Sequence, residues 1–304
     1  MNKFSLFFYV FTFVIIFVIV LHIISYLRLI LLRHKSINNI IINTIDPLNF
    51  TTYGDLKNNF NKVYFNVPIY IFIHFCPKSN DNITHLNIIN EQISALINTG
   101  LYDKCDKIYY GCNCDNCDIF LEKYLETLSY LYRYKFIKMN NAICPKIKSY
   151  ENNTINSMLD IAKKSDKHFF GLYIHTKGTT AISITQHTWR QIMMYWLVDK
   201  YKICIDILSR GFNTIGIFYS PYPKKHYSGN FFWFDSEYLK KLNFITNTTD
   251  RMEAEFFIMK GYEKDKHITL LKERYISEIN VGLYYFHAEI KDSSRDDDID
   301  LAII

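Results

Sequence analysis

The chain has 304 residues, of which 49% are hydrophobic and 21% charged, so there is enough apolar material for a substantial core. This composition excludes an intrinsically disordered chain, a coiled coil and a collagen-like chain. The 35 basic and 30 acidic residues leave a net charge of only +5, with no basic block, so no nucleic-acid partner is expected.

The amino-terminal segment is strongly apolar from Phe4 to Leu27, and His22 is the only side chain in it that titrates near neutral pH. At about 1.5 Å per residue, a helix of this length exceeds the roughly 30 Å hydrocarbon core of a bilayer. The apolar stretch is longer than that of a cleaved signal peptide, and no small-residue cleavage site follows it. Residues 1–35 are therefore predicted to form a single-pass transmembrane anchor, spanning at 4–27, with a basic flank.

The orientation of this anchor is left open, lumenal or cytoplasmic, by two opposing signals. Arg28, Arg33 and Lys35 follow the span, and the positive-inside rule then favours a cytoplasmic body. Four glycosylation sequons favour a lumenal glycoprotein instead. These sequons begin at Asn49, Asn82, Asn152 and Asn247.

Three further segments are predicted after the anchor. Residues 36–65 show little periodicity and are expected to form a stem. Residues 66–290 carry the alternating patterns of a globular domain, and residues 291–304 form an acidic tail that is expected to be solvated.

Strand and helix patterns alternate in the first half of the globular domain. Strands are predicted at 67–75, 107–110, 135–138 and 168–175, with helices over 86–97, 121–132 and 155–162 between them. This alternation indicates an α/β fold with a mainly parallel sheet and flanking helices. Ligands of such sheets bind beyond the carboxyl ends of the strands, so chemistry is expected just after Phe75, Tyr110 and Ile174.

The second half of the domain is less regular. An amphipathic helix is predicted at 189–197, a strand at 214–219, and a glycine-containing turn running into an aromatic strand at 226–234. Asp235 or Ser236 would then cap a short helix over 237–242. A last strand is predicted at 283–287.

An anion site is predicted where the strand at 168–175 ends. Alternate residues of a strand share a face, so His175 and Lys177 point the same way, and Gly178 lets the backbone turn. This pair suits a diphosphate, to which Arg190 would add a bidentate contact. The alternative for residues 175–178 is a strand that ends in a plain polar turn. The alternative for Arg190 is a surface position on a helix.

The turn at 226–230 is a second candidate site. Asn230 can hydrogen-bond a sugar hydroxyl, and Trp233 offers a flat stacking face, with His226 and Gly229 shaping the same turn. The alternative is an ordinary tight turn into a core strand.

An acid pair, Glu253 and Glu255, follows Arg251 and precedes Phe256 and Phe257. A carboxylate against aromatic walls can have a raised pKa, which suits a general base. The alternative is a solvated acidic turn.

Four of the seven cysteines cluster between residues 105 and 117. The cluster contains only one C-x2-C unit, whereas four-ligand zinc sites usually contain two such units. Unpaired thiols are therefore favoured over a metal site or a disulfide. The four are Cys105, Cys112, Cys114 and Cys117.

Four runs in one order resemble glycosyltransferase-like proteins related to the rhamnan synthesis protein F family. They are LYIHTKG (172–178), TWRQIMMYWL (188–197), TIGIFY (214–219) and SGNFFWFDSEYLKKL (228–242), within roughly residues 168–258. The wider resemblance is to GT-A glycosyltransferases, which place a nucleotide-sugar on an α/β sheet.

This resemblance implies roles for the candidate residues. Many GT-A enzymes hold a divalent metal with Asp-x-Asp where this chain has His175-Thr176-Lys177, so a need for Mn²⁺ or Mg²⁺ stays open. His175, Lys177 and Gly178, with Arg190 or Arg251, would bind the donor diphosphate in its place. Glu255 would be the general base, and Glu253 is the second choice for that role. The acceptor or sugar pocket would be formed by His226, Gly229, Asn230 and Trp233. His287 would correspond to a late metal ligand.

The resemblance therefore implies a membrane-anchored hexosyl- or deoxyhexosyltransferase. It would move a sugar from a nucleotide-diphosphate donor to a glycan or other hydroxyl acceptor. The alternative is an inactive relative that acts as a binding or scaffold protein, since Asp-x-Asp is absent. No G-x-S-x-G or H-E-x-x-H motif supports a hydrolase.

Overall fold

A computed structural model describes residues 49–62, 64, 66–76, 82–112, 124–125, 134–143, 150–179, 184–261, 266–270 and 300–303. All belong to one unit, Asn49–Ile304. The predicted anchor, the strand at 283–287 with His287, and most of the helix at 121–132 lie outside these residues. Within the described ranges no helix is both long and apolar enough to cross a bilayer.

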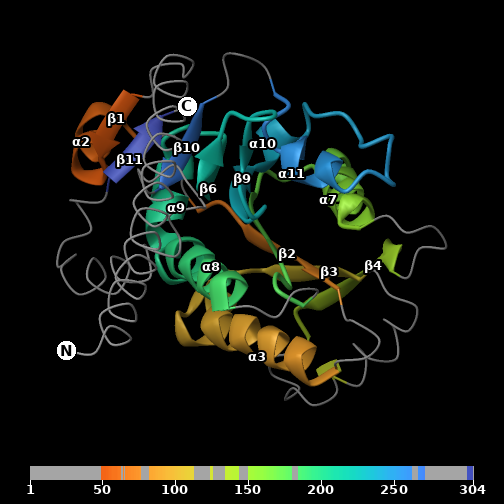
Figure 1. The fold of residues 1–304 in the computed structure, drawn as a ribbon. Coiled ribbons are helices and arrows are strands. Elements are labelled where there is room, and N and C mark those ends of the chain that lie inside the picture. The colour runs from red at the N-terminus through yellow and green to blue at the C-terminus, as the bar shows by residue number, and fades with distance from the viewer. Residues whose placement is uncertain are drawn as a thin grey trace, which may run out of the picture. The chain divides into compact units, whose positions relative to one another are not determined.

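One sheet of nine strands organises this unit, in the order β1-β11-β10-β6-β9-β5-β2-β3-β4 (Figure 1). Strands β9 and β11 run against the direction of the others. The mainly parallel α/β sheet predicted from the sequence is therefore confirmed. The strands are β1 (Asn49–Thr52), β2 (Ile69–Phe75), β3 (Lys107–Cys112), β4 (Phe136–Ile143), β5 (Phe170–His175), β6 (Thr214–Ile217), β9 (Phe232–Asp235), β10 (His267–Leu270) and β11 (Asp300–Ile303).

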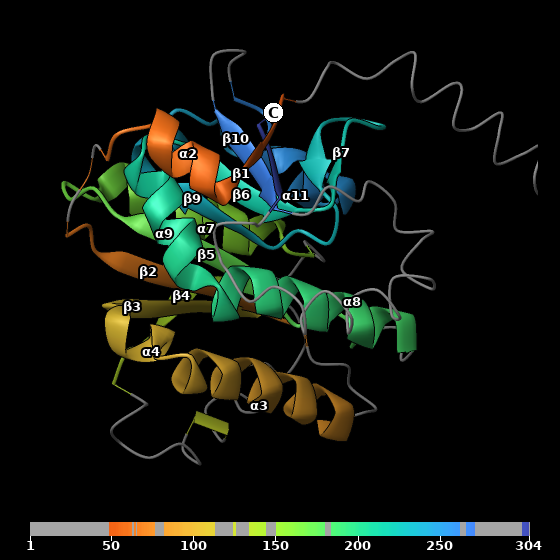
Figure 2. The ribbon, with the colours of Figure 1, turned by 90° about the vertical axis from the view of Figure 1, so that its left-hand side faces the viewer.

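Helices cover both faces of the sheet (Figure 2). One face carries α2 (Tyr53–Asn59), α3 (Asn82–Asn98), α4 (Leu101–Lys104), α8 (Ile184–Met194), the π-helix η1 (Tyr195–Asp199) and α9 (Tyr201–Ser209). The other carries α7 (Asn152–Lys164), α10 (Ser236–Leu239) and α11 (Met252–Phe257). A separate hairpin, β7 (Tyr219–Ser220) with β8 (His226–Tyr227), packs beside α11.

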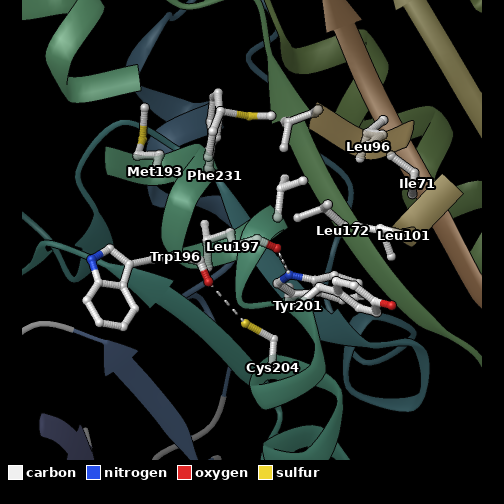
Figure 3. Close-up of a cluster of buried hydrophobic side chains, with 14 of the residues drawn as sticks. Ile71, Leu96, Leu101, Leu172, Met193, Trp196, Leu197, Tyr201, Cys204 and Phe231 are labelled. Carbon is white, nitrogen blue, oxygen red and sulfur yellow. Dashed lines mark hydrogen bonds between the residues drawn. The ribbon is translucent and has the colours of Figure 1, made fainter. Parts of the chain in front are cut away.

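The period-two alternation of β2 and β5 separates two kinds of core. Ile71 and Leu172 face the larger hydrophobic core under α3, α8 and α9, which Figure 3 shows in close-up. Their neighbours face the opposite side, where Phe72 stacks on Tyr109 with centroids 5.1 Å apart and Tyr173 stacks on Phe232 at 5.2 Å. The sheet thus has a face of mixed aliphatic and aromatic side chains and a face with stacked aromatic rings, called the aromatic face below.

The short helix predicted after the aromatic strand is confirmed as α10. The Asp235 carboxylate caps it by accepting from the backbone N–H groups of Glu237 and Tyr238. Helices α9 and α11 and strand β10 were not predicted. All three are only four to nine residues long, too short for a clear periodic signal.

The folded unit extends into both segments that were predicted to lie outside it. Strand β1 and helix α2 occupy part of the predicted stem, and β11 lies in the predicted acidic tail. Strand β11 pairs with both β1 and β10, which joins the two ends of the unit to the sheet. This pairing is between residues about 250 positions apart, so no local pattern could reveal it.

Candidate functional site

A polar cluster lies on the aromatic face of the sheet, where β2 and β5 end. These parallel neighbours are in register so that His74 is opposite His175. Helix α7 begins beside them, because the His74 Nδ1 atom lies 2.7 Å from the Thr154 hydroxyl of its first turn. Glu151, which immediately precedes α7, is thereby brought between the two strand ends.

Glu151 is the centre of this cluster. Its Oε2 atom accepts hydrogen bonds from the Tyr173 hydroxyl at 2.9 Å and the Asn230 amide at 2.7 Å. Burial alone would raise the pKa of this carboxyl. Interactions with His175 and His74 in their protonated forms, together with the two hydrogen bonds, outweigh burial and hold the pKa below its ordinary value. Glu151 is therefore an ionised carboxylate at neutral pH, with 21% of its side chain exposed.

His175 is oriented by the turn that leads into β9. Its Nε2 atom donates to the Gly229 carbonyl at 2.9 Å, since a carbonyl can only accept. Burial lowers the pKa of His175, against the opposing effect of Glu151, so the neutral ring is favoured. In that form Nδ1 carries a lone pair, and it lies 3.8 Å from Glu151 Oε1.

The same turn places Asn230. Gly229 and Asn230 have φ values of 95° and 57°, a conformation that glycine and asparagine adopt most readily. A Cβ at Gly229 would lie 2.6 Å from the Met193 sulfur. Asn230 is buried, and its Oδ1 atom has no hydrogen-bond partner among the described residues.

Lys177 lies beyond the end of β5 and is partly exposed. Its Nζ atom sits 3.8 Å from the centroid of the Trp189 ring, a cation–π contact. Burial lowers its pKa; Glu151 and Glu255 act in the opposite direction, and Arg251 adds to the lowering. Arg251 and Glu255 are thus close enough to Lys177 to influence its pKa.

Arg190 is not available as a phosphate ligand. Its Nε and Nη2 atoms donate to Glu91 at 3.0 and 2.9 Å, and Nη1 donates to the Lys177 carbonyl at 2.7 Å. Its side chain is only 4% exposed, so the prediction of a direct diphosphate contact is wrong. The residue instead anchors the turn at Gly178, where φ is 96°.

Three other predicted site residues have structural roles. Trp233 is fully buried in the larger hydrophobic core and donates to the Leu197 carbonyl at 2.7 Å, so it cannot stack on a sugar. Glu253 accepts a hydrogen bond from Lys260 and is not free to act as a base. The His226 ring is buried, donates to a backbone carbonyl at 2.8 Å and packs against Phe256.

Glu255 remains a candidate for the general base. It is partly exposed and interacts electrostatically with both His175 and Lys177. The structure therefore brings together His175, Lys177, Gly229, Asn230, Arg251 and Glu255.

Sequence reasoning missed Glu151, His74 and Tyr173. Tyr173 carried a usable signal, because it is two residues before His175 and so shares its face of the strand. His74 becomes significant only when the register of β2 against β5 is known, and Glu151 only when the start of α7 is placed beside the sheet.

Among the described residues, no group of three His, Cys, Asp or Glu side chains could hold a metal ion.

Two further expectations from the sequence are corrected. Cys112 is disulfide-bonded, whereas unpaired thiols were expected; the thiols of Cys105 and Cys204 are free. The Asn152 sequon is not a glycan acceptor, because this side chain is fully buried and donates to the carbonyls of Thr248 and Asp250.

These features define an α/β protein with a mainly parallel sheet and a polar, charged site at its strand ends. The chain belongs to the family described as "Domain of unknown function (DUF8361)", which matches residues 72–290. No curated protein matches it. Among solved structures, 4-diphosphocytidyl-2C-methyl-D-erythritol synthase from Anaerococcus prevotii DSM 20548 is similar over 73% of this chain and 96% of that chain, at 12% identity and a TM-score of 0.31.

Proposed function

We propose that this protein is a membrane-anchored glycosyltransferase that moves a sugar from a nucleotide-diphosphate donor to a glycan or other hydroxyl acceptor. The proposal takes its reaction from the resemblance of residues 168–258 to rhamnan synthesis protein F relatives. The observation that carries it is the partly exposed Lys177 at the carboxyl end of β5, beside Arg251 and Glu255. A cation and a carboxylate at this edge of a parallel sheet are the two charges that the reaction needs.

Lys177 and Arg251 would stabilise the departing diphosphate. As the bond between the sugar C1 atom and the diphosphate oxygen breaks, negative charge develops on that oxygen. An ammonium held on the face of Trp189 is already oriented before the reaction, which limits the reorganisation needed to meet this charge.

Glu255 would accept the proton of the acceptor hydroxyl as its oxygen attacks the sugar C1 atom in an inverting reaction. Its partial exposure leaves it accessible to a hydroxyl. Arg190 would contribute only by holding the Lys177 carbonyl.

The disulfide at Cys112 supports a lumenal orientation of the body. Disulfides persist in oxidising compartments and are rare in the cytosol. We therefore favour the lumenal one of the two orientations for the proposed anchor at residues 4–27.

The test is release of nucleoside diphosphate by the full-length protein in detergent micelles. UDP-, GDP- and dTDP-sugars would be supplied with a hydroxylated glycan acceptor, in Mn²⁺, Mg²⁺ or EDTA. Lys177→Met keeps the aliphatic packing on Trp189 and removes the charge. We expect it to slow release by about 10²–10³-fold, the usual effect of losing one such group.

Lys202→Met is the matched control, because Lys202 is exposed on α9 and belongs to none of the candidate site residues. Release equal to wild type in Lys177→Met would refute the assigned role. Binding of nucleoside diphosphates without turnover of any donor would favour the binding or scaffold protein.

A further inference from the structure

Three hydrogen-bond acceptors around Glu151 have no donor among the described residues. Glu151 uses Oε2 for both of its hydrogen bonds, which leaves Oε1. His175 uses Nε2 and leaves Nδ1. The third is the Asn230 Oδ1 atom, and it alone is fully buried, so leaving it without a donor is costly and points to a missing partner. The Glu151 and His175 side chains are partly exposed, at 21% and 12%, so their free acceptors are open to a ligand.

The spacing of two of these acceptors fits one hydroxyl group. Glu151 Oε1 and His175 Nδ1 are 3.8 Å apart, too far for a direct hydrogen bond. An oxygen can lie about 2.8 Å from both atoms and donate its proton to either. A neutral His175 and an ionised Glu151 cannot supply that proton themselves.

The direction of the Asn230 oxygen is fixed by the contact of this side chain with Glu151. The Asn230 amide must turn its N–H groups toward the Glu151 carboxylate, to which it donates at 2.7 Å. Its oxygen consequently points away from Glu151 and has no donor among the described residues. Asn230 thus orients the Glu151 carboxylate and offers a second acceptor beside it.

We propose that Glu151, His175 and Asn230 form a subsite that recognises neighbouring hydroxyl groups of a sugar ring. This deepens the proposed function and rests on it in taking the sugar to be a substrate. The Glu151 carboxylate repels phosphate, so we assign its neighbour His175 to the sugar, and the cations Lys177 and Arg251 to the diphosphate.

The experiment compares the affinity of the full-length protein in micelles for two sets of probes. The first set is UDP, GDP and dTDP and their glucose, galactose, mannose and rhamnose conjugates, wherever the conjugate exists. The second set is the methyl glycosides of the same four sugars. The readout in the first set is the ratio of dissociation constants between a nucleoside diphosphate and its sugar conjugate, which isolates the contribution of the sugar.

Two variants test the subsite independently. Glu151→Gln replaces the charged acceptor, and Asn230→Gly removes the amide while tolerating the positive φ. Glu151→Gln should weaken the sugar contribution by about 10- to 100-fold, the usual size of a hydrogen bond to a charged group. Asn230→Gly should weaken it by about 2- to 10-fold, the usual size of a neutral hydrogen bond, and both should leave nucleoside diphosphate affinity unchanged. Lys177→Met should weaken the affinity for nucleoside diphosphates and leave the sugar contribution unchanged. Glu237→Gln is the matched control, since Glu237 is half exposed on α10.

The outcomes separate the subsite from the proposed function. Loss confined to the conjugates identifies the donor sugar, and loss confined to the methyl glycosides identifies an acceptor sugar. Methyl glycosides that bind by way of Glu151, with no nucleotide binding, would support the subsite and overturn the glycosyltransferase. The subsite is refuted if no sugar probe binds, or if both variants, folded as judged by thermal unfolding, keep the wild-type ratio.

Discussion

Arg190→Met is expected to destabilise the protein by about 3 kcal/mol. Removing one member of a buried ion pair costs roughly 3–5 kcal/mol, because the remaining charge is left without a partner. The Arg190 side chain is 4% exposed, but that of Glu91 is 31% exposed and can be partly rehydrated. The lower end of the range therefore applies.

The assay is urea denaturation of the micelle-bound protein, followed by tryptophan fluorescence. Lys240→Met is the control, because its ion pair with Glu237 is exposed and should contribute about 0–1 kcal/mol. Arg190→Lys keeps the charge but cannot make both contacts to Glu91, so its loss should be intermediate.

The result distinguishes an anchoring arginine from a phosphate ligand. If Arg190 contacted diphosphate directly, Arg190→Met would abolish nucleotide binding and leave the free energy of unfolding unchanged. That result would refute the anchoring role. We expect a loss of stability together with a weaker effect on nucleotide affinity, since Arg190 Nη1 holds the carbonyl of Lys177.

Three further outcomes are expected. Burial lowers the pKa of His74 from 6.5 to about 4, so the unfolded chain takes up a proton first and about 3 kcal/mol of stability is lost as pH falls from 6.5 to 4; His74→Gln should flatten this loss in urea titrations. Gly171→Ala should cost at least 1–3 kcal/mol in thermal unfolding, because the new Cβ would lie 2.0 Å from the Phe234 ring; no loss would contradict this packing. Lys135→Met should cost about 1–3 kcal/mol, since buried Lys135 donates to the Tyr102 and Cys105 carbonyls at the end of α4; a wild-type urea midpoint would refute that role.

Local patterns in the sequence were sufficient for the α/β class and for part of the site. The strand leading to His175 and Lys177 was identified from its apolar run and polar end, and the cap of the short helix was narrowed to Asp235 or Ser236, of which the structure shows Asp235. Both depend on neighbours a few residues away, which is the range over which periodicity and capping act.

Tertiary packing alone decided which polar residues face one another. Arg190 and Trp233 have side chains suited to ligands. However, the Arg190 guanidinium is paired with Glu91, and the Trp233 ring is buried in the core. Conversely, Glu151 carries no local signal and gains its role from Tyr173, His175 and Asn230, which are 22 to 79 residues away. Propensities act through the nearest turns of the chain, whereas burial, charge and unsatisfied hydrogen bonds depend on residues that only the folded sheet brings together.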